Sequence, residues 1–268
     1  MIISRTKALV SFFFLTYAIS RAFWWPEALA ARGMLLPAWL GQFLTNPFNP
    51  AAFGPLIAAL ALTLAATGWR GLGAWLRQSL HLRFRARGWL VVLLLPMLIF
   101  GGGVLGTVLL GITPLESSVL SNPPYALIGF LVIFFTAGPL QEEPGWRGFA
   151  LPRLLERHSA VRASVILGIW WWLWHLPLVF IPGKFMTQDP LLFLLVGIEI
   201  VLTSILMTWV YLQTHGSVLA TMLFHTVMNG SIWMFRPSMT MTLPILALTI
   251  VLLALAVGWV VRCGLQPG

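Results

Sequence analysis

The chain has 268 residues, of which 59% are hydrophobic and only 9% are charged. A soluble domain carries about 25% charged residues, so this composition excludes a soluble globular protein. The net charge of +9 falls mainly in alternate segments between apolar stretches, which argues against nucleic acid as a partner. The single cysteine, Cys263, excludes an internal disulfide. We expect one integral membrane domain over residues 1–268, embedded in a lipid bilayer.

Apolar stretches long enough to cross a bilayer recur along the whole chain. Eight membrane spans are predicted, at residues 8–25, 50–69, 89–111, 125–142, 162–181, 190–212, 217–235 and 241–261. The expected fold is therefore an all-α polytopic membrane helix bundle. Its polar motifs fall within a core of about 125–235.

The positive charges test this number of spans. With the N-terminus in the cytoplasm, the inside segments hold 12 of the 16 Lys and Arg residues. The outside segments hold the other four, which are Arg21, Arg32, Lys184 and Arg236. Because cytoplasmic loops are enriched in Lys and Arg, this bias favours eight spans with both termini in the cytoplasm. Together with the low cysteine content, it is typical of a multi-pass protein of a bacterial plasma (inner) membrane.

The segment between the second and third spans has its own pattern. Leu72, Trp75, Leu76 and Leu80 share one helical face, and Arg77 lies on another. Such a pattern is typical of a short helix lying in the membrane interface with its arginines toward anionic headgroups. We therefore expect one interfacial helix besides the spans.

Charged residues cluster at the end of the fourth span. Glu142 and Glu143 follow an apolar run directly, and Arg147 comes one helical turn after Glu143. Charges this close to hydrocarbon are costly, so they are usually paired or functional. The spacing of Glu143 and Arg147 favours an ion pair. Glu142 points about 100° away around the helix, which leaves it free for chemistry.

Two further polar groups lie in later spans. His175 follows a run rich in tryptophan, and His225 and Asn229 lie one turn apart on one helical face. If the fourth and fifth spans form a hairpin that turns near residues 158–159, Glu142 and His175 reach the same height. His225 then lies roughly 15 Å into the seventh span, at a compatible depth. We expect the clusters to converge on one polar cavity open toward the cytoplasm.

Glu199 is isolated in the sixth span. No residue near it in the sequence is an evident partner. We interpret it as structural or unexplained rather than catalytic.

These three clusters resemble the motifs of a known family. Glu-Glu-x-x-x-Arg at 142–147, Trp-x-x-x-His at 171–175 and His-x-x-x-Asn at 225–229 are similar to those of the CPBP family, which contains type II CAAX prenyl endopeptidases and bacteriocin self-immunity proteins. Two positions depart from the family pattern, Trp171 in place of the usual phenylalanine and the pair Pro144-Gly145 inside the first motif. The resemblance implies a CAAX-protease-like intramembrane endopeptidase.

The implied mechanism is hydrolysis of a peptide bond near the cytoplasmic membrane face. Glu142 would be the general base, and His175 would help to hold the attacking water. His225 and Asn229 would donate hydrogen bonds to the tetrahedral oxygen. Glu143 and Arg147 would support this site.

A metal-dependent version stays open. Glu142, His175 and His225 are ligand types that suit Zn²⁺, with a fourth position for water and Glu143 as the base. Because these ligands come from three helices rather than one compact motif, the sequence does not decide, although we prefer the metal-free version.

The alternative to an enzyme is a membrane scaffold or bacteriocin self-immunity protein that uses the same cluster for binding or structure. A proton-coupled transporter is a third reading, but we find no internal repeat to support it. The partners expected for the enzyme are a peptide or membrane-protein substrate and the lipid bilayer.

Overall fold

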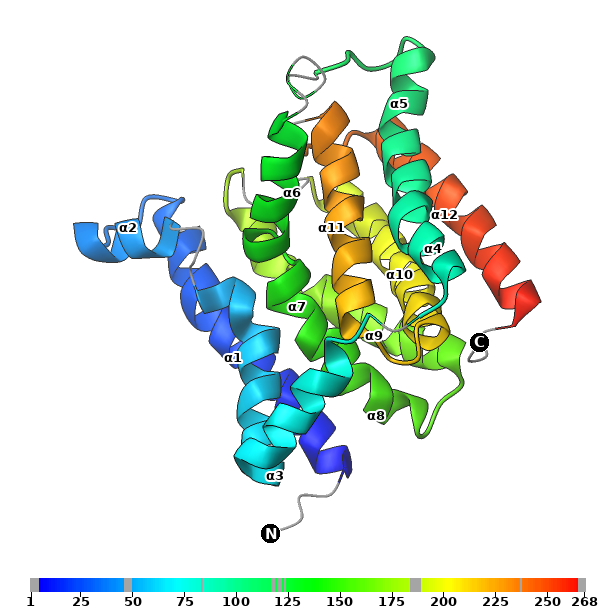
Figure 1. Ribbon diagram of the computed structural model, residues 1–268. Helices are drawn as coiled ribbons and strands as arrows, with labels where there is room; N and C mark the ends of the chain where they lie inside the picture. The colour runs from blue at the N-terminus through cyan, green and yellow to red at the C-terminus, as the bar shows by residue number, and fades with distance from the viewer. Residues whose placement is uncertain are drawn as a thin grey trace.

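The computed structural model describes residues 5–45, 50–82, 84–116, 119, 122, 124–183, 189–236 and 238–264 (Figure 1). Arg83 and Lys184, which entered the charge bias, lie outside these residues. All regular elements in the described part are helical, as predicted. They are α1 (Arg5–Ala30), α2 (Ala38–Thr45), η1 (Pro50–Phe53), α3 (Gly54–Ser79), α4 (Ala86–Pro96), η2 (Met97–Gly101), α5 (Gly102–Leu109), α6 (Pro124–Thr136), α7 (Pro139–Gly145), η3 (Trp146–Ala150), α8 (Leu151–Leu155), α9 (Ala160–Trp174), η4 (Leu176–Phe180), α10 (Pro190–Gln213), α11 (Val218–Phe235) and α12 (Leu243–Cys263).

The number of spans agrees with the prediction. Seven described helical segments are long and apolar enough to cross a membrane, and a bent pair, 124–136 with 139–155, makes an eighth candidate. The chain is thus a polytopic helix bundle. Figure 1 shows the start of α1, the end of α3 and α8 at one end of the bundle, and the end of α5 and the start of α6 at the other.

The fourth span is broken, whereas the sequence pattern predicted one continuous helix over 125–142. α6 ends at Thr136, α7 begins at Pro139, and the two segments are bent by 42°. Gly138 lies between them with φ 109°, a conformation that glycine adopts without the steric cost of a Cβ. Pro139 then begins the next helix, where its missing N–H is not needed. This break turns α7 into the bundle and sets the direction of Glu142 and Glu143.

The helix predicted at the membrane interface is the last part of α3. It continues from the second span past a break at Gly68, where φ is 65°. Leu72 on its apolar face is buried, and the indole N–H of Trp75 donates to the carbonyl of Gly148 at 3.0 Å. This face therefore packs on the protein beside α7.

Four helices surround the middle of the bundle. α9 packs along α10. It follows α8 after a turn at 156–159, close to the turn that the predicted hairpin of the fourth and fifth spans required. Ser159 caps the start of α9 by accepting from the N–H of Arg162. α11 contacts α6, α7 and α10. This packing brings the polar residues of α7, α9, α10 and α11 to one place.

Candidate active site

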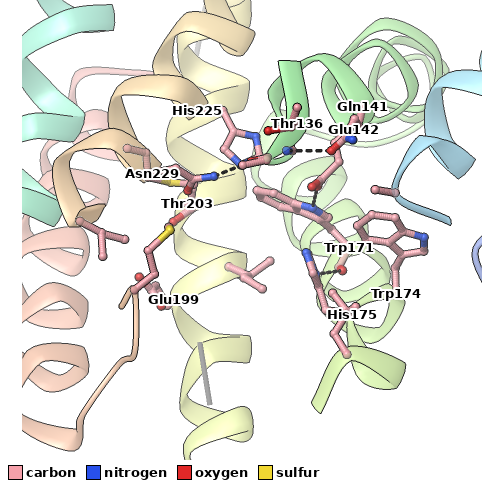
Figure 2. A pocket seen from close by; sticks show the side chains of 18 of the residues that line it. Thr136, Gln141, Glu142, Trp171, Trp174, His175, Glu199, Thr203, His225 and Asn229 are labelled. Carbon is pink, nitrogen blue, oxygen red and sulfur yellow. Dashed lines mark hydrogen bonds between the residues drawn. The ribbon is translucent and has the colours of Figure 1, made fainter. Parts of the chain in front are cut away.

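A cavity of about 520 Å³ lies between these helices. Its walls come from α7, α9, α10 and α11, with contributions from α1 and from residues 183, 238 and 239. Figure 2 shows Glu142, His175, His225 and Asn229 around this space. The structure therefore brings together the four residues that the sequence pattern selected.

The cavity extends toward the end of the bundle opposite to the one at which we expected it to open. Residues 238–239 follow the end of α11, and residue 183 precedes the start of α10. Residues 238–239 lie a whole helix length from the turn at 214–217, which the charge bias assigns to the cytoplasm. The lining thus extends away from the arginine-rich end, whereas we expected it to open toward that end.

Glu142 lies on the first turn of α7 and is 6% exposed. Its backbone N–H donates to the carbonyl of Gly138 at 2.8 Å, so the break after α6 sets its position. Its carboxylate Oε2 accepts the indole N–H of Trp171 at 2.5 Å. Trp171 lies one turn before His175, so Glu142 contacts the helix about one turn from the residue that the hairpin predicted at its height.

Glu143 links two charged partners. Its Oε1 accepts from Arg147 Nη1 at 3.1 Å, which is the ion pair that the spacing predicted. The same oxygen is 2.8 Å from Nδ1 of His225, a contact between α7 and α11 that sequence reasoning missed. The guanidinium of Arg147 also lies over the Trp171 ring, 4.3 Å from its centre. The side chains of Glu143 and Arg147 are both fully buried, so their ion pair is shielded from solvent.

His225 presents its second nitrogen to the cavity. Because the carboxylate of Glu143 only accepts, Nδ1 carries the hydrogen and Nε2 is left as an acceptor in the neutral ring. A Cβ placed on Gly138 would lie 3.1 Å from His225 Nε2 and 2.8 Å from Glu142 Oε1. The two atoms are therefore no further apart than the sum of these distances, about 6 Å. Both atoms are therefore within reach of one small group placed beside Gly138.

His175 and Asn229 are each held by a backbone carbonyl. His175 Nδ1 donates to the carbonyl of Trp171 at 2.8 Å, which leaves Nε2 as the acceptor of a neutral ring. The Asn229 amide donates to the carbonyl of Ala137 at 2.9 Å, at the break before α7. One amide hydrogen satisfies that carbonyl, and the second is available to another acceptor.

The ligand set considered for a metal does not form a prepared site. Among the described residues, no three His, Cys, Asp or Glu side chains are grouped so that they could hold a metal ion. The hydrogen bonds of His225 Nδ1 to Glu143 and of Trp171 to Glu142 Oε2 leave His225 Nε2 and Glu142 Oε1 on the cavity side, so they neither build a metal site nor occupy these two atoms. We therefore derive no chemical step through a metal.

Comparison with known proteins agrees with the three motifs. Residues 124–231 match the family described as type II CAAX prenyl endopeptidase Rce1-like. CAAX prenyl protease 2 of Methanococcus maripaludis is 34% identical over 92 residues, which are 33% of this chain and 34% of that protein. The motif-bearing segment belongs to the CPBP family. The match with this relative spans about a third of its length.

The two departures from the CPBP pattern have structural roles here. Trp171 supplies the N–H that Glu142 accepts, which a phenylalanine in its place lacks. At Gly145, a Cβ would lie 2.5 Å from the carbonyl oxygen of Pro55, so glycine permits the close approach of α7 to α3. The helix continues past Pro144 into the wider turn of η3, and this continuation preserves the contact between Glu143 and Arg147.

Glu199 also lines this cavity, although the sequence pattern predicted no role for it. It is 3% exposed on α10, and Thr203 lies one turn further along the same wall. The usable signal was the spacing of Glu199 and Thr203 within an otherwise apolar span, which puts two polar groups on one face.

Proposed function

We propose that this chain is a membrane-embedded endopeptidase that hydrolyses a peptide bond with a water activated by Glu142. One observation carries the proposal: Glu142 Oε1 and His225 Nε2 flank Gly138 within about 6 Å, at the wall of a cavity large enough for a peptide. This is the arrangement that a general base and a partner on the opposite side of a reacting carbonyl require. The family and the name of the relative, a CAAX prenyl protease, support the same reaction class.

The proposed reaction begins when Glu142 takes a proton from a water whose oxygen attacks the peptide carbonyl carbon. His175, whose Nδ1 donates to the Trp171 carbonyl, accepts the other hydrogen of that water at Nε2 and orients it. As the C–O bond forms, the carbonyl electrons move to the oxygen, which accepts hydrogen bonds from the Asn229 amide and, when Nε2 also carries a hydrogen, from His225. The C–N bond then breaks, and Glu142 passes its proton to the leaving amine.

Glu143 and Arg147 act on this reaction through His225. A carboxylate that accepts from Nδ1 fixes the orientation of the imidazole and stabilises its protonated form. Arg147 compensates the charge of Glu143, since an unpaired buried carboxylate is strongly disfavoured. Both are positioning residues in this proposal.

We place the reaction in the cytoplasmic half of the membrane. The arginine-rich segments assign the 214–217 turn to the cytoplasm. His225 lies seven residues after the start of α11, or about 10 Å from that turn at 1.5 Å per residue. A substrate in the cavity would then extend from the cytoplasmic half toward the opposite end.

The experiment that tests the function uses protein reconstituted in liposomes and a library of membrane peptides that includes a prenylated CAAX peptide. Products are identified by mass spectrometry for wild type, Glu142→Gln and Glu156→Gln. Glu156 is an exposed residue after α8, so its substitution controls for the loss of one carboxylate. We expect cleavage by wild type and Glu156→Gln and none by Glu142→Gln. Full activity of Glu142→Gln would disprove the glutamate-base mechanism.

A non-proteolytic scaffold or self-immunity protein is the second candidate. The contacts of Glu143 with Arg147 and His225 favour this candidate, because they hold α7 against α11 whether or not a reaction occurs. It predicts that no peptide is cleaved and that variants of the cluster change only stability or binding.

A further inference from the structure

Glu199 presents a buried carboxylate that no protein group satisfies in the described structure. The residue is 3% exposed, and its Oε2 has no hydrogen-bond partner among the described residues. It lines the cavity that contains Glu142, and Figure 2 shows it on the wall opposite Trp171 and His175. A carboxylate left unpaired at membrane depth is costly, so a group that enters the cavity and pairs with it gains binding energy.

The charge of the cavity indicates what this group is. Two carboxylates, from Glu142 and Glu199, line it, and no lysine or arginine is found among its described lining residues. A second negative charge from a ligand would be repelled, whereas an ammonium or guanidinium group would find an uncompensated partner. The lining of the cavity also includes the apolar side chains of Ile200 and Phe100, which suit the aliphatic stem of a basic side chain.

Helix geometry gives the distance between Glu199 and the proposed reaction centre. Glu199 lies 14 residues before the end of α10, and His225 lies seven residues after the start of the antiparallel α11. At 1.5 Å per residue, Glu199 is roughly 10 Å further from the 214–217 turn than His225 is. An extended peptide covers about 3.3 Å per residue, so this distance corresponds to about three residues.

We propose that Glu199 is a specificity-determining residue that binds a basic side chain of the substrate peptide, about three residues from the hydrolysed bond. This inference rests on the proposed function, since it names the substrate class of the same site. Glu199 is not a catalytic residue in this proposal. Its effect should therefore appear in substrate binding and selectivity.

Binding is measured without turnover to separate the two proposals. The protein carries Glu142→Gln, is embedded in lipid nanodiscs, and is titrated with fluorescently labelled leucine–alanine peptides. Each peptide carries one lysine, norleucine or glutamate, and the position of this residue is moved by one residue from peptide to peptide. Norleucine keeps the aliphatic stem and lacks the ammonium group. The same titration is repeated with proteins that carry, besides Glu142→Gln, one further substitution: Glu199→Gln, Glu199→Asp or, as the matched control, Glu156→Gln.

We expect the lysine peptide to bind at least about tenfold more tightly than the norleucine peptide at one register. Glu199→Gln should reduce this ratio to near one, while Glu156→Gln leaves it unchanged. Glu199→Asp, which keeps the charge on a shorter stem, should retain part of it. The inference is overturned if no peptide binds, if lysine gives no preference, or if the preference survives Glu199→Gln in protein with unchanged melting temperature.

The same peptides, incubated with the enzyme that retains Glu142, distinguish the two failures. Cleavage without a lysine preference would leave the proposed function standing and remove the role of Glu199. A lysine preference that depends on Glu199, without any cleavage, would remove the peptidase and keep the binding site.

Discussion

Glu143 and His225 are joined by a contact of 2.8 Å between Oε1 and Nδ1, although 82 residues separate them in the chain. The contact connects α7 to α11 and sets the direction of the remaining imidazole nitrogen. It gives the second glutamate of the motif a role distinct from that of Glu142, whose carboxylate accepts from Trp171 instead. Two adjacent carboxylates are thus directed to different partners by their angle around one short helix.

Arg147→Ala should destabilise the protein by about 3–5 kcal/mol, because it leaves the fully buried Glu143 carboxylate without its cation. Arg157→Ala, at an exposed position in the 156–159 turn, is the matched control and should have little effect. Unfolding in detergent, followed by tryptophan fluorescence, compares the variants. The double variant Arg147→Ala/Glu143→Gln should recover part of the loss, and equal stability of all four proteins would contradict the ion-pair argument.

Gly138→Ala should abolish most activity. The new Cβ would be 2.8 Å from Glu142 Oε1 and 3.1 Å from His225 Nε2, so both groups must move. Misplacement of catalytic groups by about 1 Å costs on the order of 100-fold in rate. Gly68→Ala is the control, since Gly68 also has a positive φ but open space around it. Both variants should lose stability through backbone strain, and only Gly138→Ala should lose cleavage as measured by initial rates.

Trp171→Phe tests the hydrogen bond to Glu142. The substitution keeps an aromatic ring and removes the donor, and a hydrogen bond to a charged group is worth about 1.5–3 kcal/mol. Turnover should fall by about tenfold to a hundredfold. The control is Trp172→Phe, which removes an indole donor to the carbonyl of Phe193 instead. A comparable loss of turnover in both variants would point to packing rather than to the carboxylate.

The orientation of the bundle is testable by cysteine labelling. Cys263→Ser should preserve activity and gives a background without thiols, because Cys263 is the single cysteine. A cysteine at Arg77 or Arg157 should then react only with membrane-permeant reagents, and one at Arg236 should react with impermeant ones. The opposite labelling would move the proposed site to the outer half of the membrane.

Local features explain which parts were predictable. Hydrophobic length predicts spans, and the isolated charges of Glu142, Glu143 and Arg147 mark the site, because both are properties of short stretches. The break at Gly138 was signalled by the Gly-Pro pair, yet hydrophobicity continues through it and masks the signal.

Contacts between helices were harder to predict from the sequence. The pairing of Glu143 with His225 depends on how α7 and α11 are rotated against each other, which no spacing within one helix determines. Glu199 looked isolated for the same reason, since its neighbours in space come from other helices. The reach of the cavity toward residue 183 and residues 238–239 likewise depends on where the loops fold.

Gly145 lies against Pro55 so closely that α7 and the start of α3 share one packed surface. Trp174, beside His175, also donates its indole N–H to Ser20 on α1 at 2.7 Å. Both partners precede the segment 124–231 that matches the family. The matched segment is consequently not an autonomous module: a fragment that begins at residue 124 would lack one wall of its cavity. Transplanting the motif helices into another membrane protein would require carrying α1 and α3 with them.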